Sequence, residues 1–305
     1  MALPLVVLGD FAWDVLIRTN TRLLPGGDTY GEVQLMPGGS AANVAVWAQR
    51  CGLKTGFIGK IGLDRMGELA RDDLNAEQVQ SWLLHSDAQL TGSVAVFVDE
   101  TGERSMVSGR GADHFLLPSE LPRQVISEAG CLHLTAWSFF TDPPRAAARE
   151  AARIARQAGV PISFDPASFQ MIHETGLNAF LKGTADLGIS VLLPNYEEGN
   201  VLTGETEPEA IAVRLAELYP GALIMLKLDA NGALVHQAGE STRIPPAPGQ
   251  LVDATGAGDA FAGAFLSRYL TGSSAVEAAS FATRISAWVI QRLGARPRGD
   301  FSRLL

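Results

Sequence analysis

The sequence predicts a single α/β domain, spanning residues 1–305, with a central, mostly parallel β-sheet flanked by helices and a small β-sheet lid. Short apolar runs alternate along most of the chain with stretches of helical periodicity, which is typical of a parallel sheet with helical crossovers. Two segments, at about 12–36 and 92–110, break this alternation and look like strands without crossover helices. No tandem repeat or flexible linker separates them from the rest, so we expect them to be insertions that form the lid.

The first expected strand is Leu5–Leu8, an apolar run that ends at Gly9-Asp10. Such an end is typical of a buried strand that opens towards a ligand crevice. A helix is expected after Gly38-Gly39-Ser40, since apolar residues then recur at helical spacing: Val44, Trp47, Ala48 and Cys51.

The lid segments carry turn residues between short apolar runs. Residues 11–36 predict two strands around the turn Pro25-Gly26-Gly27, and residues 93–98 and 104–108 predict a hairpin around the loop 99–103. Both faces of the strand 93–98 carry apolar side chains: Val94, Val96 and Val98 on one, Ala95 and Phe97 on the other. The main domain can cover only one face, so we expect a homodimer that forms through the lid.

The rest of the chain returns to the alternating pattern. Four further apolar strands are expected at Leu132–Leu134, Ile162–Phe164, Val191–Leu193 and Leu223–Leu228. Helical stretches lie between them, for example Arg145–Ala158 and Pro208–Leu218. This order extends the parallel sheet.

The composition excludes several classes of protein. The 24 Lys and Arg residues and the 33 Asp and Glu residues give a net charge of −9, which argues against a broad nucleic-acid surface or attachment to an anionic membrane. With 47% hydrophobic and 19% charged residues, the chain is too apolar for a disordered protein. No apolar run approaches the roughly 18 residues that span a bilayer. Cys51 and Cys131 form no CxxC pair and are expected to be buried thiols in a cytoplasmic protein.

The glycine-rich turn Asp253-Ala-Thr-Gly-Ala-Gly-Asp259 runs directly into a helical pattern. Small residues at a helix start leave backbone N–H groups uncovered, and the helix dipole adds positive potential there. The turn therefore predicts an anion hole, with Asp259 placed to accept a proton from a hydroxyl beside a bound phosphate. The alternative is structural: Thr255 caps the helix and Asp259 only complements the dipole.

Other well-known motifs are missing from the sequence. There is no Gly-x4-Gly-Lys-Ser/Thr of a Walker-type NTPase, no Gly-x-Gly-x-x-Gly of a dinucleotide fold, and no Gly-x-Ser-x-Gly elbow of a hydrolase. His173-Glu174 is not followed by a second His at the spacing of a zinc protease.

Three motifs together resemble the ribokinase-like, or PfkB-type, carbohydrate kinases. Asp253–Asp259 looks like the C-terminal signature of that family, and Gly38-Gly39-Ser-Ala-Ala-Asn43 through Gly59–Gly67 looks like its N-terminal one. Asn195-Tyr-Glu-Glu198 resembles the Asn-x-x-Glu motif associated with magnesium and phosphate. The resemblance covers almost the whole chain, including the lid, and implies a ribokinase-like fold.

The resemblance also implies the residues of phosphoryl transfer. Asp259 matches the catalytic base, and the anion hole is matched by Gly256, Ala257 and Gly258. Asn195 and Glu198 would hold Mg²⁺, through water. The segment Lys227-Leu-Asp229-Ala-Asn-Gly232 resembles a nucleotide-binding strand and turn, so Asn195, Lys227, Asp229, Gly232 and Gly258 are implied as ATP-binding residues.

On the substrate side, Asp14 matches an aspartate that accepts hydrogen bonds from sugar hydroxyls, and Asn43 matches a second sugar contact. Gly38 and Gly39 would let the backbone approach the sugar closely. Arg110 lies near an arginine that contacts the substrate carboxylate in the sugar-acid kinases of the family. The structural alternatives are a turn aspartate for Asp14, a helix-cap residue for Asn43 and a lid-to-core salt bridge for Arg110.

The sequence also departs from the family pattern. Asp229 stands where relatives usually have Gly, and Thr135 stands where ribokinases have a sugar-binding Glu. Asp165-Pro-Ala-Ser-Phe169 lacks the Asp-x-Asn-x-Arg of fructokinases and 2-keto-3-deoxygluconate kinases. Asp253 is a candidate ligand for a potassium ion, but Arg298 replaces a serine ligand in the same loop.

The resemblance thus implies an ATP- and Mg²⁺-dependent kinase that phosphorylates a hydroxymethyl group of a sugar or sugar-like small molecule. The alternatives are a nucleoside or sugar-acid kinase and a non-catalytic sugar-binding regulator on the same scaffold. Neutral sugars or nucleosides are expected to be better substrates than 2-keto-3-deoxygluconate.

Overall fold

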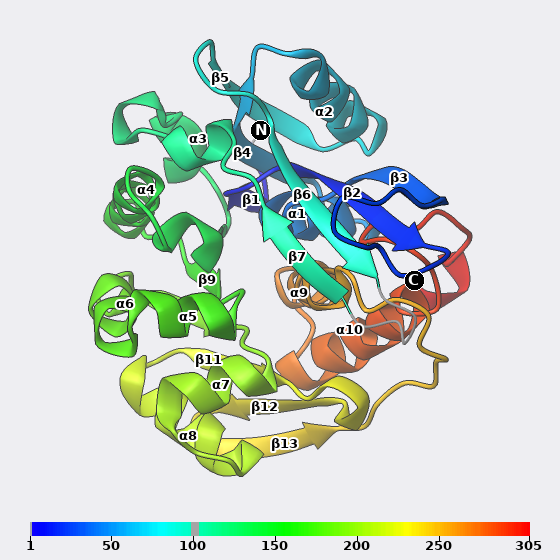
Figure 1. Cartoon of the computed structure of the whole chain (residues 1–305). Helices are drawn as coiled ribbons and strands as arrows, with labels where there is room; N and C mark the ends of the chain where they lie inside the picture. Colours follow the sequence, from blue (N-terminus) through cyan, green and yellow to red (C-terminus); the bar gives the residue numbers. More distant parts are fainter. Residues whose placement is uncertain (1, 99–103) are drawn as a thin grey trace.

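The computed structural model describes residues 2–98 and 104–305 of the chain. Within these residues, nine strands form one sheet in the order β13-β12-β11-β10-β9-β8-β1-β4-β5 (Figure 1). In chain order they are β1 (Leu5–Leu8), β4 (Thr55–Gly62), β5 (Gln80–Ser86), β8 (Leu132–Thr135), β9 (Ile162–Asp165), β10 (Ile189–Leu192), β11 (Leu223–Lys227), β12 (Ala233–Gln237) and β13 (Glu240–Ile244).

The strands from β11 to β5 all pair in parallel, and only β12 and β13 join in antiparallel fashion within the described chain. The predicted, mostly parallel sheet is thus confirmed, whereas the β12–β13 hairpin was not predicted. The exposed outer strand β13, Glu240-Ser-Thr-Arg-Ile244, is mostly polar and lacks an apolar run. Strand order reverses at β1, so a crevice is expected at the carboxyl ends of β1 and β8.

Helices cover both faces of the sheet. One face is covered by α1 (Ser40–Arg50), α2 (Arg65–Ala76), α9 (Ala257–Tyr269) and α10 (Ala275–Val289). The other is covered by α3 (Arg123–Ser127), α4 (Pro144–Gln157), α5 (Phe169–Thr175), α6 (Leu177–Thr184), α7 (Tyr196–Thr203) and α8 (Pro208–Leu218). Both faces need cover because successive side chains of a buried strand point to opposite faces of the sheet. In β1, Leu5 and Val7 pack into one core, and Val6 and Leu8 pack into the other.

The lid is a second, four-stranded sheet in the order β3-β2-β6-β7. Its strands are β2 (Ala12–Thr19), β3 (Gly31–Pro37), β6 (Gly92–Val98) and β7 (Arg104–Ser108). The predicted hairpin loop 99–103 lies outside the described residues. One face buries Leu16, Val96 and Val98. The other face leaves apolar side chains exposed: Val33, Leu35, Phe97 and Val107.

Two further observations concern the cysteines and the helices. Cys51 and Cys131 are buried, free thiols, as expected. Among the described residues, none of the helices has the length and apolar character needed to cross a bilayer.

Candidate active site

Two helix N-termini meet beneath the lid, and Asp259 lies between them. Asp259 is in the first turn of α9, and its carboxylate accepts hydrogen bonds from Ser40 Oγ at 2.6 Å and Asn43 Nδ2 at 2.8 Å, both from α1. The helices approach closely because Gly263 has no side chain: a Cβ there would lie 2.7 Å from the Val44 backbone oxygen. The contact between α1 and α9 therefore fixes the position of the Asp259 carboxylate.

The start of α9 has the conformation that the glycine turn predicts. Gly256 is the N-cap residue with a φ of 69°, and a Cβ there would lie 2.5 Å from the Ala295 Cβ, so only glycine fits. As a glycine, this residue supplies no side-chain cap of its own. Thr255 precedes this N-cap residue, and its hydroxyl donates to Asp253 Oδ1 at 2.6 Å. The Ala257 N–H donates to the Ala254 carbonyl oxygen at 3.2 Å, so an anion hole in this first turn would be formed mainly by Gly258 and its neighbours.

Asp253 joins the glycine turn to the loop that follows α10. Its Oδ1 also accepts the Thr255 N–H, and its Oδ2 accepts the Gly294 N–H at 2.8 Å. A potassium ion at this position would have to share these carboxylate oxygens. Arg298, which replaces the serine ligand of relatives, is exposed.

The predicted sugar-binding residues gather around Asp259. Asp14 lies on β2, and a Cβ on Gly38 would lie 2.5 Å from the Asp14 carboxylate, so the missing side chain leaves this carboxylate accessible. Gly39 has a φ of 85° and is the N-cap residue of α1, where a Cβ would lie 2.7 Å from the Asp10 carbonyl oxygen. Asn43 completes the group through its contact with Asp259.

Burial changes the acidity of both carboxyl groups. Burial raises the pKa of Asp259 to about 6, although the hydrogen bonds from Ser40 and Asn43 oppose the shift. Burial also raises the pKa of Asp14 to about 7, with Arg296 opposing the shift and the charges of Asp259 and Asp10 adding to it. A carboxylate with a pKa near 6 is a suitable general base at neutral pH.

Sequence reasoning missed Arg296, which is buried behind the sugar-binding residues. Its guanidinium donates to Asn43 Oδ1 at 2.6 Å, to Asp73 Oδ2 at 2.6 Å and to the Gly38 carbonyl at 2.8 Å. Arg296 therefore sets the amide orientation of Asn43, whose Nδ2 points at Asp259. The sequence drew attention to the segment 292–298 but not to which of its arginines points inward.

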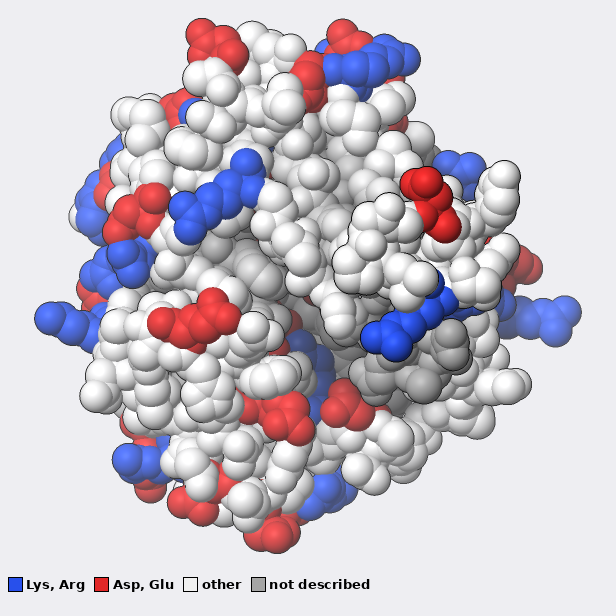
Figure 2. Space-filling view, viewed as in Figure 1, with Lys and Arg blue, Asp and Glu red and all other residues white. Residues whose placement is uncertain are grey.

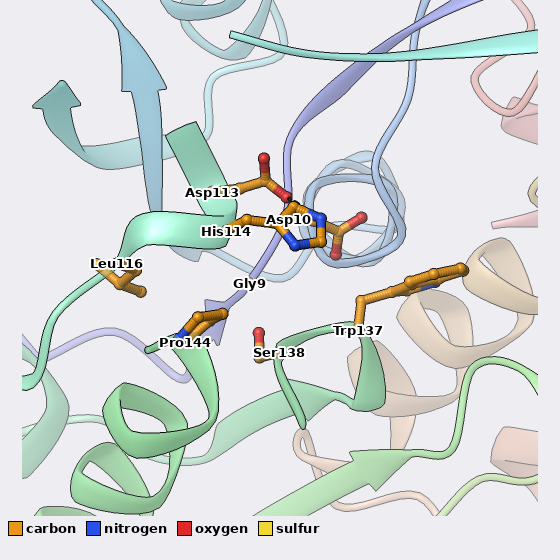
Figure 3. A pocket seen from close by; sticks show the side chains of 8 residues that line it. All are labelled: Gly9, Asp10, Asp113, His114, Leu116, Trp137, Ser138 and Pro144. Carbon is orange, nitrogen blue, oxygen red and sulfur yellow. Dashed lines mark ion pairs between the residues drawn. The ribbon is translucent and has the colours of Figure 1, made fainter. Parts of the chain in front are cut away.

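Asp10 was also missed as a site residue. Its carboxylate accepts the N–H groups of Ser40 at 2.7 Å and Ala41 at 3.2 Å, so it caps α1 from the end of β1. On its other side is a small cavity that is also lined by Asp113, His114 and Ser138 (Figure 3). Burial, with the charge of Asp10 adding to it, raises the pKa of Asp113 to about 7.

The expected nucleotide and metal residues lie at the carboxyl ends of β9, β10 and β11. Asn195 and Glu198 form a reciprocal capping box at the start of α7: Asn195 Oδ1 accepts the Glu198 N–H, and the Glu198 carboxylate accepts the Asn195 N–H and Nδ2. Lys227 Nζ donates to Asp165 Oδ2 at 2.7 Å in a buried ion pair. The sequence did not single out Asp165 as a site residue.

Among the described residues, no group of three or more His, Cys, Asp or Glu side chains is arranged to hold a metal directly, so a divalent cation at this cluster would bind through water. Burial, together with the nearby charge of Asp165, raises the pKa of Glu198 well above its ordinary value. A bound cation would favour the ionised form of Glu198, because its charge would add to that of Lys227. Carboxylate and amide oxygens suit Mg²⁺, which commonly binds through its retained waters.

The remaining residues that the sequence predicted for ATP and substrate binding lie at the edge of the candidate site. Asp229 is exposed and adopts a φ of 49°, a conformation that glycine reaches more easily. Gly232 has a φ of 84°, and a Cβ there would lie 2.1 Å from the Ile244 carbonyl oxygen. Arg110 is exposed just after β7, and its charge acts on His114. Figure 2 shows a hollow below the lid in which charged side chains of both signs lie close together.

Comparison with known proteins agrees with this geometry. A sequence model described as pfkB family carbohydrate kinase matches residues 4–299. The chain belongs to this family. It is 33% identical to a fructokinase of Escherichia coli over 87% of this chain and 84% of the relative, and 30% identical to a ribokinase of Haemophilus influenzae over 97% and 95%.

Solved structures show the same fold. An adenosine kinase from Sinorhizobium meliloti superposes with a TM-score of 0.88 at 24% identity, over 97% of this chain and 96% of that one. The ribokinase-like fold is therefore confirmed. As a member of the pfkB family, this kinase is a phosphotransferase that uses ATP and acts on an alcohol group of a sugar.

Proposed function

We propose that this kinase transfers the γ-phosphoryl group of ATP, with Mg²⁺, to a hydroxymethyl group of a neutral sugar or sugar-like molecule. The observation that carries the proposal is the Asp259 carboxylate, which lies beside the uncapped N-terminus of α9 and faces the sugar-side residues of α1. Base and anion hole are thus next to each other, as an in-line transfer requires.

In the proposed reaction, Asp14 accepts hydrogen bonds from substrate hydroxyls, and Asn43 and the backbone at Gly38 and Gly39 orient the ring. Asp259 takes the proton of the attacking hydroxyl as its oxygen forms a bond to the γ-phosphorus. The bond from phosphorus to the bridging oxygen breaks, and ADP leaves with the electron pair. The amides of Gly256, Ala257 and Gly258 bind the oxygens on which negative charge develops.

ATP would lie along the ends of β10 and β11, near Asn195, Lys227, Asp229 and Gly232. Glu198 and Asn195 are positioned to hold Mg²⁺ through its waters, and the ion would supply positive charge to the triphosphate when bound. Potassium activation through Asp253 is a separate prediction, tested by replacing KCl with choline chloride in the assay. A cytoplasmic location likewise stays a prediction.

Charge favours a neutral substrate over a sugar acid. Three carboxyl groups surround the proposed sugar site, from Asp10, Asp14 and Asp259, and Arg110 is exposed at the rim. A substrate carboxylate would be repelled by these groups unless an arginine faced it. The adenosine kinase fold supports a nucleoside as the second candidate.

The decisive experiment is an ATP-consumption screen over fructose, ribose, adenosine and 2-keto-3-deoxygluconate, followed by kcat/KM measurements. We expect a neutral compound to lead the panel and Arg110→Ala to leave the ranking unchanged. If the sugar acid leads and Arg110→Ala selectively removes that preference, the neutral-substrate proposal is wrong. If all compounds bind without turnover, the protein is a sugar-binding regulator.

The outer face of the lid supports the proposal of a homodimer. Val33 is 68% exposed and Val107 is 65% exposed, and they lie on the same face as Leu35 and Phe97. A second lid placed on this face would bury all four side chains. Sedimentation at micromolar concentration should show a dimer that Val107→Glu dissociates. A monomeric wild-type protein, with and without substrate, would reject the dimer.

A further inference from the structure

Lys227 is the last residue of β11, and its side chain points towards the start of α9. A Cβ on Gly258 would lie 3.5 Å from Lys227 Nζ, closer than to any other atom outside the helix and the neighbouring residues. The ammonium group therefore lies at the side of the second residue of the helix, where the backbone N–H groups are open to an anion.

Two buried carboxyl groups, those of Asp165 and Glu198, act on the charge of Lys227. Its Nζ donates to Asp165 Oδ2 at 2.7 Å, and the side chains of both residues are almost fully buried. An ammonium group has three N–H donors, and this contact uses one of them. The others are available to an oxygen atom that enters the anion hole.

The second buried cation of this region has a different task. Arg296 directs its three nitrogens to Asn43, Asp73 and the Gly38 carbonyl, on the sugar side of Asp259. Lys227 lies on the opposite, phosphate side. It is thus the group whose position lets it meet the negative charge that develops on the transferring phosphoryl group.

We propose that Lys227 is a catalytic residue, whose ammonium group binds an oxygen of the transferring phosphoryl group beside the amide of Gly258. This inference rests on the proposed function and goes beyond a contact that merely binds ATP. The ammonium donates hydrogen bonds and keeps its protons throughout: the hydroxyl proton goes to Asp259, and the electron pair leaves with ADP. Asp165 is a positioning residue that keeps the lysine extended towards α9.

The test separates transition-state binding from nucleotide binding. Lys227→Met is expected to lower kcat by about 10²- to 10³-fold, as for the loss of one oxyanion-hole donor, with a much smaller change in KM for ATP. Lys227→Arg should recover part of the loss, because it keeps a positive charge near Gly258. A direct readout is the affinity for ADP with Mg²⁺ and substrate, with and without aluminium fluoride as a mimic of the phosphoryl group. The Lys227→Met variant should bind ADP alone as tightly as the wild type does. It should not show the increase in ADP affinity that aluminium fluoride causes in the wild type.

A second variant tests whether Lys227 affects activity only by stabilising the fold. Lys227→Met leaves the Asp165 carboxylate buried without its cation, which can destabilise the fold. The double variant Asp165→Asn, Lys227→Met removes both charges, so its Tm should recover while kcat stays low. Recovery of kcat together with Tm would overturn the proposal, as would retention of more than about a tenth of the wild-type kcat by Lys227→Met. A loss of ADP affinity equal to the loss of kcat would also overturn it. Absence of wild-type activity on every substrate would instead reject the proposed function.

Discussion

The N-termini of α1 and α9 begin in similar ways but are prepared for different ligands. Both helices have a glycine N-cap with a positive φ, Gly39 at 85° and Gly256 at 69°. At α1, the carboxylate of Asp10 accepts the first two N–H groups. At α9, the N-cap glycine supplies no side-chain cap, and among the described residues no carboxylate from a neighbouring strand accepts the first N–H groups in the way that Asp10 does at α1. One N-terminus is therefore closed by a carboxylate, and the other is open to a phosphate.

This difference shows that a helix start does not define an anion site by itself. A carboxylate delivered from the end of a neighbouring strand cancels the positive potential of α1 and makes that helix end suitable for a neutral sugar. The adjacent open end of α9 keeps its potential for the phosphoryl group. The two ends share Asp259, which accepts hydrogen bonds from α1 while belonging to α9.

The largest effect is expected from the shared carboxylate. Asp259→Asn should lower kcat by roughly two to four orders of magnitude, because it removes a positioned base. The amide can still accept one hydrogen bond and donate another, so substrate and ADP affinities should change little. Steady-state kinetics with calorimetric binding measure both. A variant that retains more than about a tenth of the activity would show that Asp259 is not the base.

The pH dependence of kcat/KM should follow the protonation of Asp259. With the pKa of Asp259 raised to about 6, the unprotonated base prevails above that pH, and kcat/KM should fall about tenfold per pH unit below it. Asp14 titrates near pH 7 in the free protein and should steepen the loss. Asp14→Asn removes this second titration, so the acid limb should become less steep. A profile that is flat from pH 5 to 8 would contradict this assignment.

Two glycine substitutions at the start of α9 should separate an effect on activity from an effect on stability. Gly258→Ala meets only an ordinary contact at 3.5 Å, so the Tm should not fall, but the methyl group narrows the anion hole and should lower kcat/KM about tenfold, or about 1.4 kcal/mol. Gly256→Ala should instead lower the Tm, since its φ is 69° and its Cβ would meet Ala295 at 2.5 Å. Equal losses of Tm in both variants would argue against an open anion hole at Gly258.

The smallest effect is expected at the closed helix end. Asp10→Ala removes the cap of α1 and should reduce stability by about 1 kcal/mol, which corresponds to a fall of about 2–4 °C in Tm. Thermal unfolding measures the change, and Asp28→Ala, at an exposed carboxylate, is the control. An unchanged Tm in Asp10→Ala would mean that the α1 N-terminus does not need its carboxylate.

Much of this arrangement could be predicted from the sequence because its causes are local. Apolar runs and helical periodicity predicted β1, β8, β9 and β11 to within a residue or two at each end. The glycine turn before Asp259 predicted an open helix start, since the backbone conformation at Gly256 depends on its own missing side chain and on its neighbours. The lid segments were predicted from turn residues between short strands.

The remaining site residues depend on contacts between distant segments. Asp165 and Lys227 are 62 residues apart and form an ion pair because their strands end at the same edge of the sheet, with β10 between them. Arg296 reaches Asn43 across 253 residues, and Asp10 reaches Ser40 across 30. No local pattern distinguishes a buried arginine or aspartate from an exposed one, because burial is set by what the tertiary fold packs around it. The sequence by itself determined the elements and the glycine turns. Only the tertiary structure decided which helix end is closed, which is open, and which charged side chains face them.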